Sequence, residues 1–297
     1  MRQRVVTMMA VSLCIGLTAW ADDPPADTAT VTDAAGKEVK LVSFKPTAGV
    51  RRLAWLADPK SQGDEARKGP FALELREPHS TTFSKGVVTL VPLSGIESIR
   101  YDYDKHTMAV SVKGLTEPLA GTLQYKGINV LSFDADVGGI TGKFTGGVPG
   151  TGIKSIALRG AKPLAARPSG GAAWNVQIVQ PLANHPTLLV RNLKPLFAFP
   201  NGSEVLLDAI PARKGDAVSL TTHGFKRLEI LAVDPNTQLA ALEVHPEDGA
   251  ERVVMVPLTL EQDKKAATLV GLLGEVDAGW KLFPLHTIKV ITPDAKK

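Results

Sequence analysis

Apolar and polar residues alternate along most of this chain, in short runs separated by glycine, proline, asparagine or aspartate. A period of two predicts β-strands, and turn signals at intervals of roughly 8 to 12 residues are typical of a β-sandwich or a small β-barrel. The sequence therefore predicts an all-β protein with at most one or two short helices. Strands are expected at 37–44, 49–57, 71–75, 87–93, 96–103, 107–112, 119–125, 128–133, 153–158, 174–179, 188–192, 204–210, 217–221, 225–233, 239–244, 252–258 and 280–291.

Three segments have more specific local signals. Thr259-Leu-Glu-Gln262 has the spacing of a capping box and predicts a helix over 260–269, with a polar loop before a strand as the alternative. Lys126-Gly127 predicts a hairpin between the strands at 119–125 and 128–133. The glycine-rich run 138–152 is not followed by a helix or by the Lys-Ser or Lys-Thr of a P-loop, so we expect a turned segment and not a phosphate site.

Two parts of the chain resemble each other. Gly49 to Pro59 returns at Gly224 to Pro235 with one inserted residue. A second pair of blocks follows in the same order: 72–75 leading to 87–93, against 241–244 leading to 253–258. In addition, the Pro-Leu-x-x-Ile-x-x-Ile shape of 92–99 recurs near the end of the chain at 284–291, and it predicts a strand, a proline step and another strand at both places. These matches predict two related β-domains in tandem.

The first residues have the features of a signal peptide. Arg2 and Arg4 precede an apolar run that ends at Ala19-Trp-Ala21, a small-residue cleavage site. The apolar run is shorter than the roughly 20 residues that a membrane anchor needs. We therefore predict an exported protein, with residues 1–21 as signal peptide, 28–160 as the first domain, 161–173 as a linker rich in proline, glycine and serine, and 174–293 as the second domain, with no transmembrane span after signal removal.

Cleavage changes the chemistry that the chain can offer. Cys14, the one cysteine, leaves with the signal, which excludes disulfide and thiol chemistry. Loss of two arginines leaves 32 basic against 30 acidic residues, so the net charge falls from +4 to +2. Nucleic-acid binding is therefore not expected. Arg51 and Arg52 are expected to pair with acids or to extend toward solvent, with anion binding as the alternative.

Candidate chemistry is sparse. The sequence has no Gly-x-Ser-x-Gly, His-Glu-x-x-His or His-x-His motif, and its six histidines are scattered. Two aspartate pairs with i, i+2 spacing, Asp102 with Asp104 and Asp134 with Asp136, would each point to one face of a strand, and converging carboxylates of this kind suggest calcium. The alternative for both pairs is a role in turns.

His79 and His245 follow the two matching Ala-Leu-Glu strands, and His245 is followed by Glu247 and Asp248. A histidine beside an acid could serve as acid and base, although hairpin loops explain both positions equally well.

These observations lead to two hypotheses. The first is a non-catalytic protein of the cell envelope, periplasm or exterior that binds an unknown protein or glycan through loops or strand edges, with self-association by strand addition as a further possibility. It requires no cofactor other than the calcium considered above. The second is a secreted hydrolase, acting on carbohydrate, that uses a carboxylate pair assembled from different strands.

Overall fold

The computed structural model describes residues 29–41, 43–57, 68–76, 86–123, 130–137, 140–148, 150, 152–164, 171–179, 187–214, 217–220, 224–262 and 265–294. Within these ranges the chain is all β, as the sequence predicted, and no helix has seven or more residues. None of its helices is long and apolar enough to cross a membrane in the part described. Below, "first half" means the described residues up to 164 and "second half" those from 171 onward.

The first half contains twelve strands and two of the single-turn 3₁₀ helices. They are β1 (Ala29–Asp33), β2 (Glu38–Leu41), β3 (Lys45–Ala48), β4 (Val50–Arg52), η1 (Ala54–Leu56), β5 (Phe71–Arg76), β6 (Val88–Pro92), η3 (Leu93–Gly95), β7 (Ile96–Asp102), β8 (Thr107–Val112), β9 (Leu119–Thr122), β10 (Leu131–Val137), β11 (Ile140–Gly146) and β12 (Ile153–Leu158).

The second half adds twelve more strands and one 3₁₀ turn. They are β13 (Ala173–Ile178), β14 (Thr187–Ala198), β15 (Glu204–Leu206), β16 (Ala209–Ile210), β17 (Val218–Ser219), β18 (Phe225–Asp234), β19 (Leu239–Pro246), β20 (Arg252–Pro257), β21 (Thr259–Gln262), β22 (Lys265–Val276), β23 (Gly279–Phe283), η4 (Leu285–Thr287) and β24 (Ile288–Pro293).

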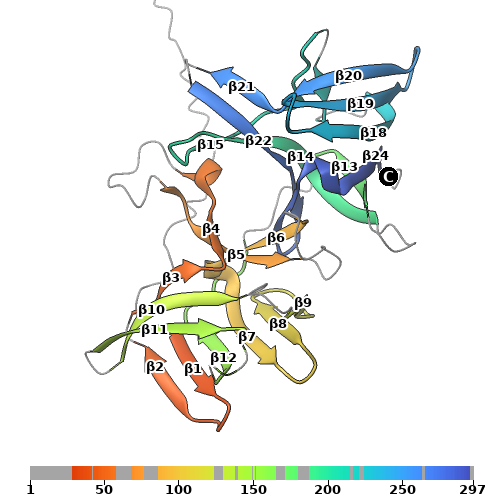
Figure 1. Cartoon of the computed structure of the whole chain (residues 1–297). Coiled ribbons are helices and arrows are strands. Elements are labelled where there is room, and N and C mark those ends of the chain that lie inside the picture. Colours follow the sequence, from red (N-terminus) through yellow and green to blue (C-terminus); the bar gives the residue numbers. More distant parts are fainter. Residues whose placement is uncertain are drawn as a thin grey trace, which may run out of the picture.

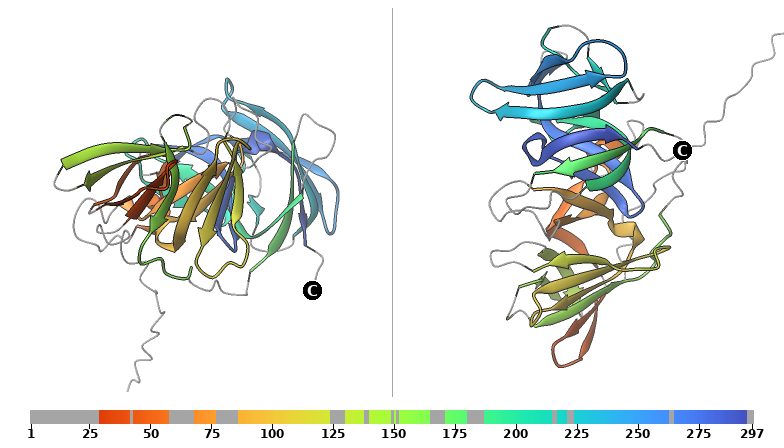
Figure 2. Two further views of the ribbon diagram at one scale, coloured as in Figure 1. Left: turned by 90° about the horizontal axis from the view of Figure 1, so that it is seen from below. Right: turned by 90° about the vertical axis from the view of Figure 1, so that its right-hand side faces the viewer.

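The strands form several sheets, none of which closes into a barrel. A six-stranded sheet, β2-β1-β12-β7-β8-β9, and a three-stranded sheet, β11-β10-β3, belong to the first half. The largest sheet follows the order β20-β19-β18-β24-β13-β14-β22-β23-β6-β5-β4 and contains strands of both halves. The halves lie end to end, and β4, β5 and β6 form the part of the first half that adjoins the second (Figures 1 and 2).

Each half has its own hydrophobic core, and a third cluster lies between them. Phe133 and Ile99 belong to the core of the first half, and Trp174, stacked on Phe225, to that of the second. The third cluster joins side chains of both halves: Leu53, Ala72, Leu90, Leu196, Leu273, Trp280 and Leu282. Because buried apolar area is the main stabilising term in folding, this third cluster holds the two halves together.

The junction itself is a pairing of β6 with β23. Trp280 lies opposite Leu90, Lys281 opposite Thr89, and Leu282 opposite Val88. Each strand continues through a proline into a 3₁₀ turn and then into a strand that has different pairing partners. The two series are β6–η3–β7 and β23–η4–β24. The recurrence of the Pro-Leu-x-x-Ile shape is thus a shared strand, proline turn and strand, as expected.

The longer match between Gly49–Pro59 and Gly224–Pro235 does not correspond to one shared element. The predicted strand over 49–57 stops at Arg52, and Leu53 begins the η1 turn, whereas Leu228 lies within the ten-residue strand β18. Leu53 packs in the junction cluster and Leu228 in the core of the second half. The expected tandem duplication is therefore not confirmed.

Three local expectations were wrong. The segment over 260–269 forms β21 and part of β22 and not a helix, because β21 pairs with β22 along its whole length. β9 and β10 do not form a hairpin with each other: β9 pairs with β8, and β10 with β11 and β3. The glycine-rich run contains the regular strand β11, since each residue of β11 has a partner on β10.

The expected linker is attached to the first half at its start. Lys162 donates its backbone N–H to the carbonyl oxygen of Ser94 at 2.8 Å, and Leu164 packs against the core of the first half. Ala173, its expected last residue, already begins β13. Residues 165–170 lie outside the described ranges.

Candidate functional site

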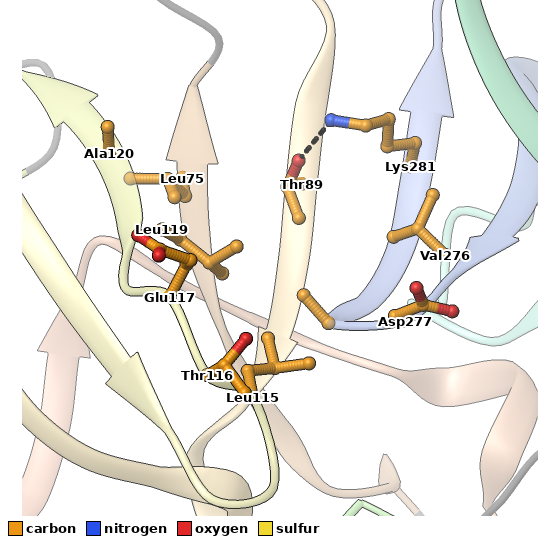
Figure 3. Close-up of a pocket in the computed structure, with 11 residues that line it drawn as sticks. Leu75, Thr89, Leu115, Thr116, Glu117, Leu119, Ala120, Val276, Asp277 and Lys281 are labelled. Carbon is orange, nitrogen blue, oxygen red and sulfur yellow. Dashed lines mark hydrogen bonds between the residues drawn. The ribbon is translucent and has the colours of Figure 1, made fainter.

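A cleft of about 420 Å³ opens where the two halves meet (Figure 3). Its walls come from β5, β6 and the segment 115–120 in the first half, and from the β22–β23 hairpin in the second. The residues that line it are Leu75, Thr89, Leu115, Thr116, Glu117, Leu119, Ala120, Val276, Asp277, Ala278 and Lys281. Its volume is within the range of small-molecule and peptide sites.

The cleft exists because β6 and β23 pair so closely. Gly279 at the start of β23 has φ +144°, and a Cβ built there would lie 2.0 Å from the carbonyl oxygen of Leu90. A side chain of any kind would therefore push the two strands apart, so glycine is required for this approach. The tight Asp277-Ala278 turn that precedes Gly279 forms one wall.

Lys281 and Thr89 form the polar centre of the cleft. They lie opposite each other on neighbouring strands, and Lys281 Nζ donates a hydrogen bond to Thr89 Oγ1 at 2.9 Å (Figure 3). Since alternate residues of a strand face opposite sides, their neighbours Leu90 and Trp280 point to the other side of the sheet, into the junction cluster. The floor of the cleft is thereby supported from behind by a packed apolar layer.

Two carboxylates stand on opposite sides of the cleft. Glu117 comes from the β8–β9 connection and Asp277 from the β22–β23 turn (Figure 3). Both are exposed, and the Asp277 side chain, 83% exposed, has Arg191 Nη1 at 3.7 Å. The remaining surface is mostly apolar, from Leu75, Leu115, Leu119 and Val276. Apolar surface, one ammonium and two carboxylates give the cleft the means to bind a ligand of mixed character.

The far side of the junction carries a partly buried ion pair. Arg51 of β4 pairs with Glu204 of β15, and their side chains are 21% and 7% exposed. Burial raises the pKa of the Glu204 carboxyl above its ordinary value, and the charge of Arg51 opposes that shift. Trp55 packs edge-on against Trp280 with ring centroids 6.0 Å apart. These contacts fix the two walls of the cleft relative to each other.

Arg51 behaves as the sequence predicted, and Arg52 contacts an aromatic ring and a backbone carbonyl group. Arg51 pairs with an acid, as just described. The Arg52 guanidinium lies 3.7 Å from the centroid of the Phe71 ring and donates to the Gly69 carbonyl oxygen at 2.9 Å.

The two aspartate pairs lie in different sheets and away from the cleft lining. Asp102 ends β7, where its Oδ1 accepts a hydrogen bond from the Lys105 backbone N–H at 3.0 Å, and this bond holds the pKa of Asp102 below its ordinary value. Asp104 is exposed in the same turn.

Asp134 and Asp136 lie on β10, and Asp134 has Lys45 and Lys143 as its cross-strand neighbours. Within the described ranges, neither aspartate pair gains a third His, Cys, Asp or Glu close enough to share an ion. Calcium at these residues stays a prediction, and an unchanged melting temperature between EDTA and millimolar calcium would exclude it.

The other sequence candidates have different outcomes. His245 contacts Glu243 and Glu251, not the Glu247 and Asp248 that follow it directly. His79 and the predicted cleavage residues Ala19 and Ala21 lie outside the described ranges.

Sequence reasoning did not single out any residue of the cleft. The sequence signal that could have indicated the cleft is the proline turn at Pro284, which matches the one at Pro92. The strand that precedes Pro284 needs a neighbouring strand to pair with, and that neighbour is β6. Comparison with protein-family models, with curated proteins and with solved structures gave no match.

Proposed function

We propose that this is an exported, non-catalytic binding protein of the cell envelope or exterior, and that it holds an extended peptide segment of a partner protein in the cleft between its halves. The observation that carries the proposal is the position of the cleft at the β6–β23 pairing, where Lys281 and Thr89 form a polar centre and each half supplies aliphatic side chains and one carboxylate. The signal-peptide pattern of residues 1–21 supports export.

The lining favours a peptide over a glycan. Four aliphatic side chains, Leu75, Leu115, Leu119 and Val276, offer a surface for an apolar residue of the ligand. Lys281 can attract a carboxylate, and Glu117 and Asp277 can attract basic groups. Among the described residues, the lining contains no aromatic ring, the flat apolar surface on which a sugar ring would pack.

A neighbouring strand edge offers main-chain hydrogen bonds. Leu119 and Ala120 belong to β9, which ends the order of the six-stranded sheet and pairs with β8 alone among the described strands. An extended peptide in the cleft can add to such an edge, so that backbone pairing gives affinity and the aliphatic side chains of the lining give selectivity. The same edge is where self-association by strand addition would occur.

The experiment begins with the mature chain, residues 22–297, as bait for a displayed library of random peptides. Enriched peptides are then synthesised, and their binding is measured by fluorescence anisotropy. Lys281→Glu and Glu117→Lys are expected to weaken binding at least tenfold, because each reverses a charge in the cleft. The matched control is Lys289→Glu on the exposed side of β24, which should leave binding unchanged. Absence of enriched peptides, or equal loss in the control, would refute the proposal.

The alternative is a hydrolase that uses the cleft carboxylates as its catalytic pair. The observation in its favour is that Glu117 and Asp277 stand across the same cleft. A general acid in such a pair is usually kept protonated by an apolar environment, whereas both side chains here are exposed to solvent. Binding is therefore preferred. Hydrolysis of a polysaccharide by the mature chain that is lost in both Glu117→Gln and Asp277→Asn would reverse that preference.

A further inference from the structure

We propose that the outer face of the β18–β19 pair binds a divalent transition metal ion through Glu229, Glu243 and His245. These residues are far from the cleft in the sheet order: β18, β19 and β20 form one end of the large sheet, whereas β23 and β6 lie toward the other. The site therefore does not depend on the peptide-binding proposal.

Strand register brings the three side chains together. Glu229 lies directly opposite Glu243, and Arg227 opposite His245, in the antiparallel β18–β19 ladder. Glu243 and His245 are two residues apart on β19 and therefore share a face, while Leu242 and Val244 between and beside them are buried in the core. One ligand atom from each of Glu229, Glu243 and His245 lies within 4.8 Å of the other two.

Two like charges in direct cross-strand opposition are unfavourable unless a cation lies between them. Arg227 pairs with Glu229 from the outer side. Glu243 faces His245, whose Nε2 lies 3.3 Å from Glu243 Oε2. The side chains are only partly exposed, at 23% for Glu229, 30% for Glu243 and 23% for His245, so solvent screens this repulsion incompletely.

The imidazole is oriented as in a metal site. His245 Nδ1 lies 2.7 Å from Glu251 Oε1, and because a carboxylate can only accept, Nδ1 carries the hydrogen. Nε2 is buried and has no hydrogen-bond partner among the described residues. In metal sites, a carboxylate usually accepts a hydrogen bond from one ring nitrogen of a ligating histidine and thereby orients the other ring nitrogen toward the metal.

The donor set selects the class of metal. One imidazole nitrogen and two carboxylate oxygens suit zinc and its first-row neighbours, whereas calcium takes about six to eight oxygens. Ligand atoms bound tetrahedrally at about 2.1 Å lie about 3.4 Å apart, so side-chain rotations that bring the present atoms closer by up to ~1.4 Å complete the set. The three ligands come from one face of a sheet, which leaves the outer coordination positions open to water or to another molecule.

A rival explanation is an imidazolium that forms ion pairs with two carboxylates. A positively charged His245 would hold Glu251 and Glu243 without any metal. It predicts no zinc affinity at this face, so metal titration separates the two explanations.

The test uses the mature chain after EDTA treatment and desalting. Zinc is titrated by calorimetry against a competing chelator, and cobalt is then added as a spectroscopic probe. We expect one zinc ion per chain and visible cobalt absorption bands from the bound ion. His245→Ala and Glu243→Gln should each lower zinc affinity at least 100-fold, and Glu251→Gln by about 10- to 100-fold, because it removes only the supporting carboxylate.

Two controls complete the design. His286→Ala removes an exposed histidine of the η4 turn and should bind zinc as the wild type does. Glu243→Gln keeps the size of the side chain, and circular dichroism checks that it folds. Zinc binding that survives His245→Ala, or a wild-type titration no different from that of His245→Ala, would overturn the proposal. Lys281→Glu should leave zinc affinity unchanged, so failure of the cleft proposal would not affect this one.

Discussion

Lys281 donates a hydrogen bond to Thr89 across the junction, and the two residues hold the same place in their strands, three residues before Pro284 and Pro92 respectively. Thr89 and Lys281 are 192 residues apart in the sequence, and so are the two prolines. Val88 opposite Leu282 and Leu90 opposite Trp280 complete an arrangement with a local two-fold axis between Thr89 and Lys281. The cleft lies at this axis because the paired strands turn away at their prolines.

The first prediction concerns the close approach of the strands at Gly279. Gly279→Ala should lower the free energy of unfolding by several kcal/mol, roughly 3 or more, because its Cβ would meet the Leu90 carbonyl oxygen and its φ is one that L-residues rarely adopt. Urea denaturation followed by circular dichroism measures this change.

Gly202→Ala is the matched control, since Gly202 also has a positive φ, +83°, but has open space around the position of a Cβ. It should cost only about 1 to 2 kcal/mol. Equal effects of the two substitutions would show that the contact with Leu90 is unimportant.

A second prediction concerns the Arg51–Glu204 pair. Arg51→Met should lower the free energy of unfolding by about 2 to 4 kcal/mol, because it leaves the 7%-exposed Glu204 carboxylate without its counter-charge. The control is Lys194→Met, which breaks the exposed Lys194–Asp208 pair and should cost less than about 1 kcal/mol. A double substitution, Arg51→Met with Glu204→Met, should recover most of the lost stability. Persistent loss in the double variant would contradict this explanation.

A third prediction follows from the raised pKa of Glu204 and concerns pH. A carboxyl whose pKa is higher in the folded than in the unfolded state binds its proton more tightly when folded, so protonation stabilises the fold. This stabilisation is absent well above the raised pKa, appears as the pH falls through it, and is complete below the ordinary value of 4.5. Relative to Glu204→Gln, which cannot titrate, the wild type should therefore gain stability as the pH falls from 8 toward 4.5.

Urea denaturation of both proteins at several pH values measures that difference directly. Subtraction removes the opposite contributions of carboxyls such as Asp234, whose pKa is lowered by hydrogen bonds from Thr237 and Asn236. A difference that is constant with pH, or that falls on acidification, would contradict the prediction.

The fourth prediction is that the two halves unfold together. They share the β6–β23 pairing and the junction cluster, so opening one half exposes apolar surface of the other. Far-ultraviolet circular dichroism and tryptophan fluorescence should give coincident urea transitions. Leu90→Ala, which empties a fully buried position in the junction cluster, should cost about 2 to 5 kcal/mol and separate the transitions. Two separate transitions in the wild type would refute this expectation.

Local pattern was sufficient for much of the secondary structure. The expected strands at 107–112 and 153–158 coincide with β8 and β12. In β8 the reason is plain, because buried and more exposed residues alternate along the strand. Pattern failed at 260–269, where the capping-box residues lie in a strand hairpin. The spacing Thr-x-x-Glu/Gln is short enough to arise in a strand, and pairing of β21 with β22 outweighs the local preference.

For the candidate sites, too, strand pairing decided what local sequence pattern could not. His245 was expected in the loop after the strand at 239–244, whereas β19 continues to Pro246 and places Glu243 and His245 on one face. Glu229 joins them only through the β18–β19 register, and Glu251 only through the following turn. For the cleft, Thr89 and Lys281 are 192 residues apart, and neither carries a motif.

By itself, the sequence determined the all-β class, most strand positions and the two proline turns, because these depend on residue periodicity and on backbone restrictions within a few residues. Tertiary structure alone decided that the halves share one sheet and that a cleft forms where β6 and β23 pair. It also decided that two glutamates and a histidine meet on β18 and β19, toward one end of that sheet. Such features depend on which strand edges pair and in what register, and that choice is made by burial summed over the whole molecule and not by any short stretch of chain.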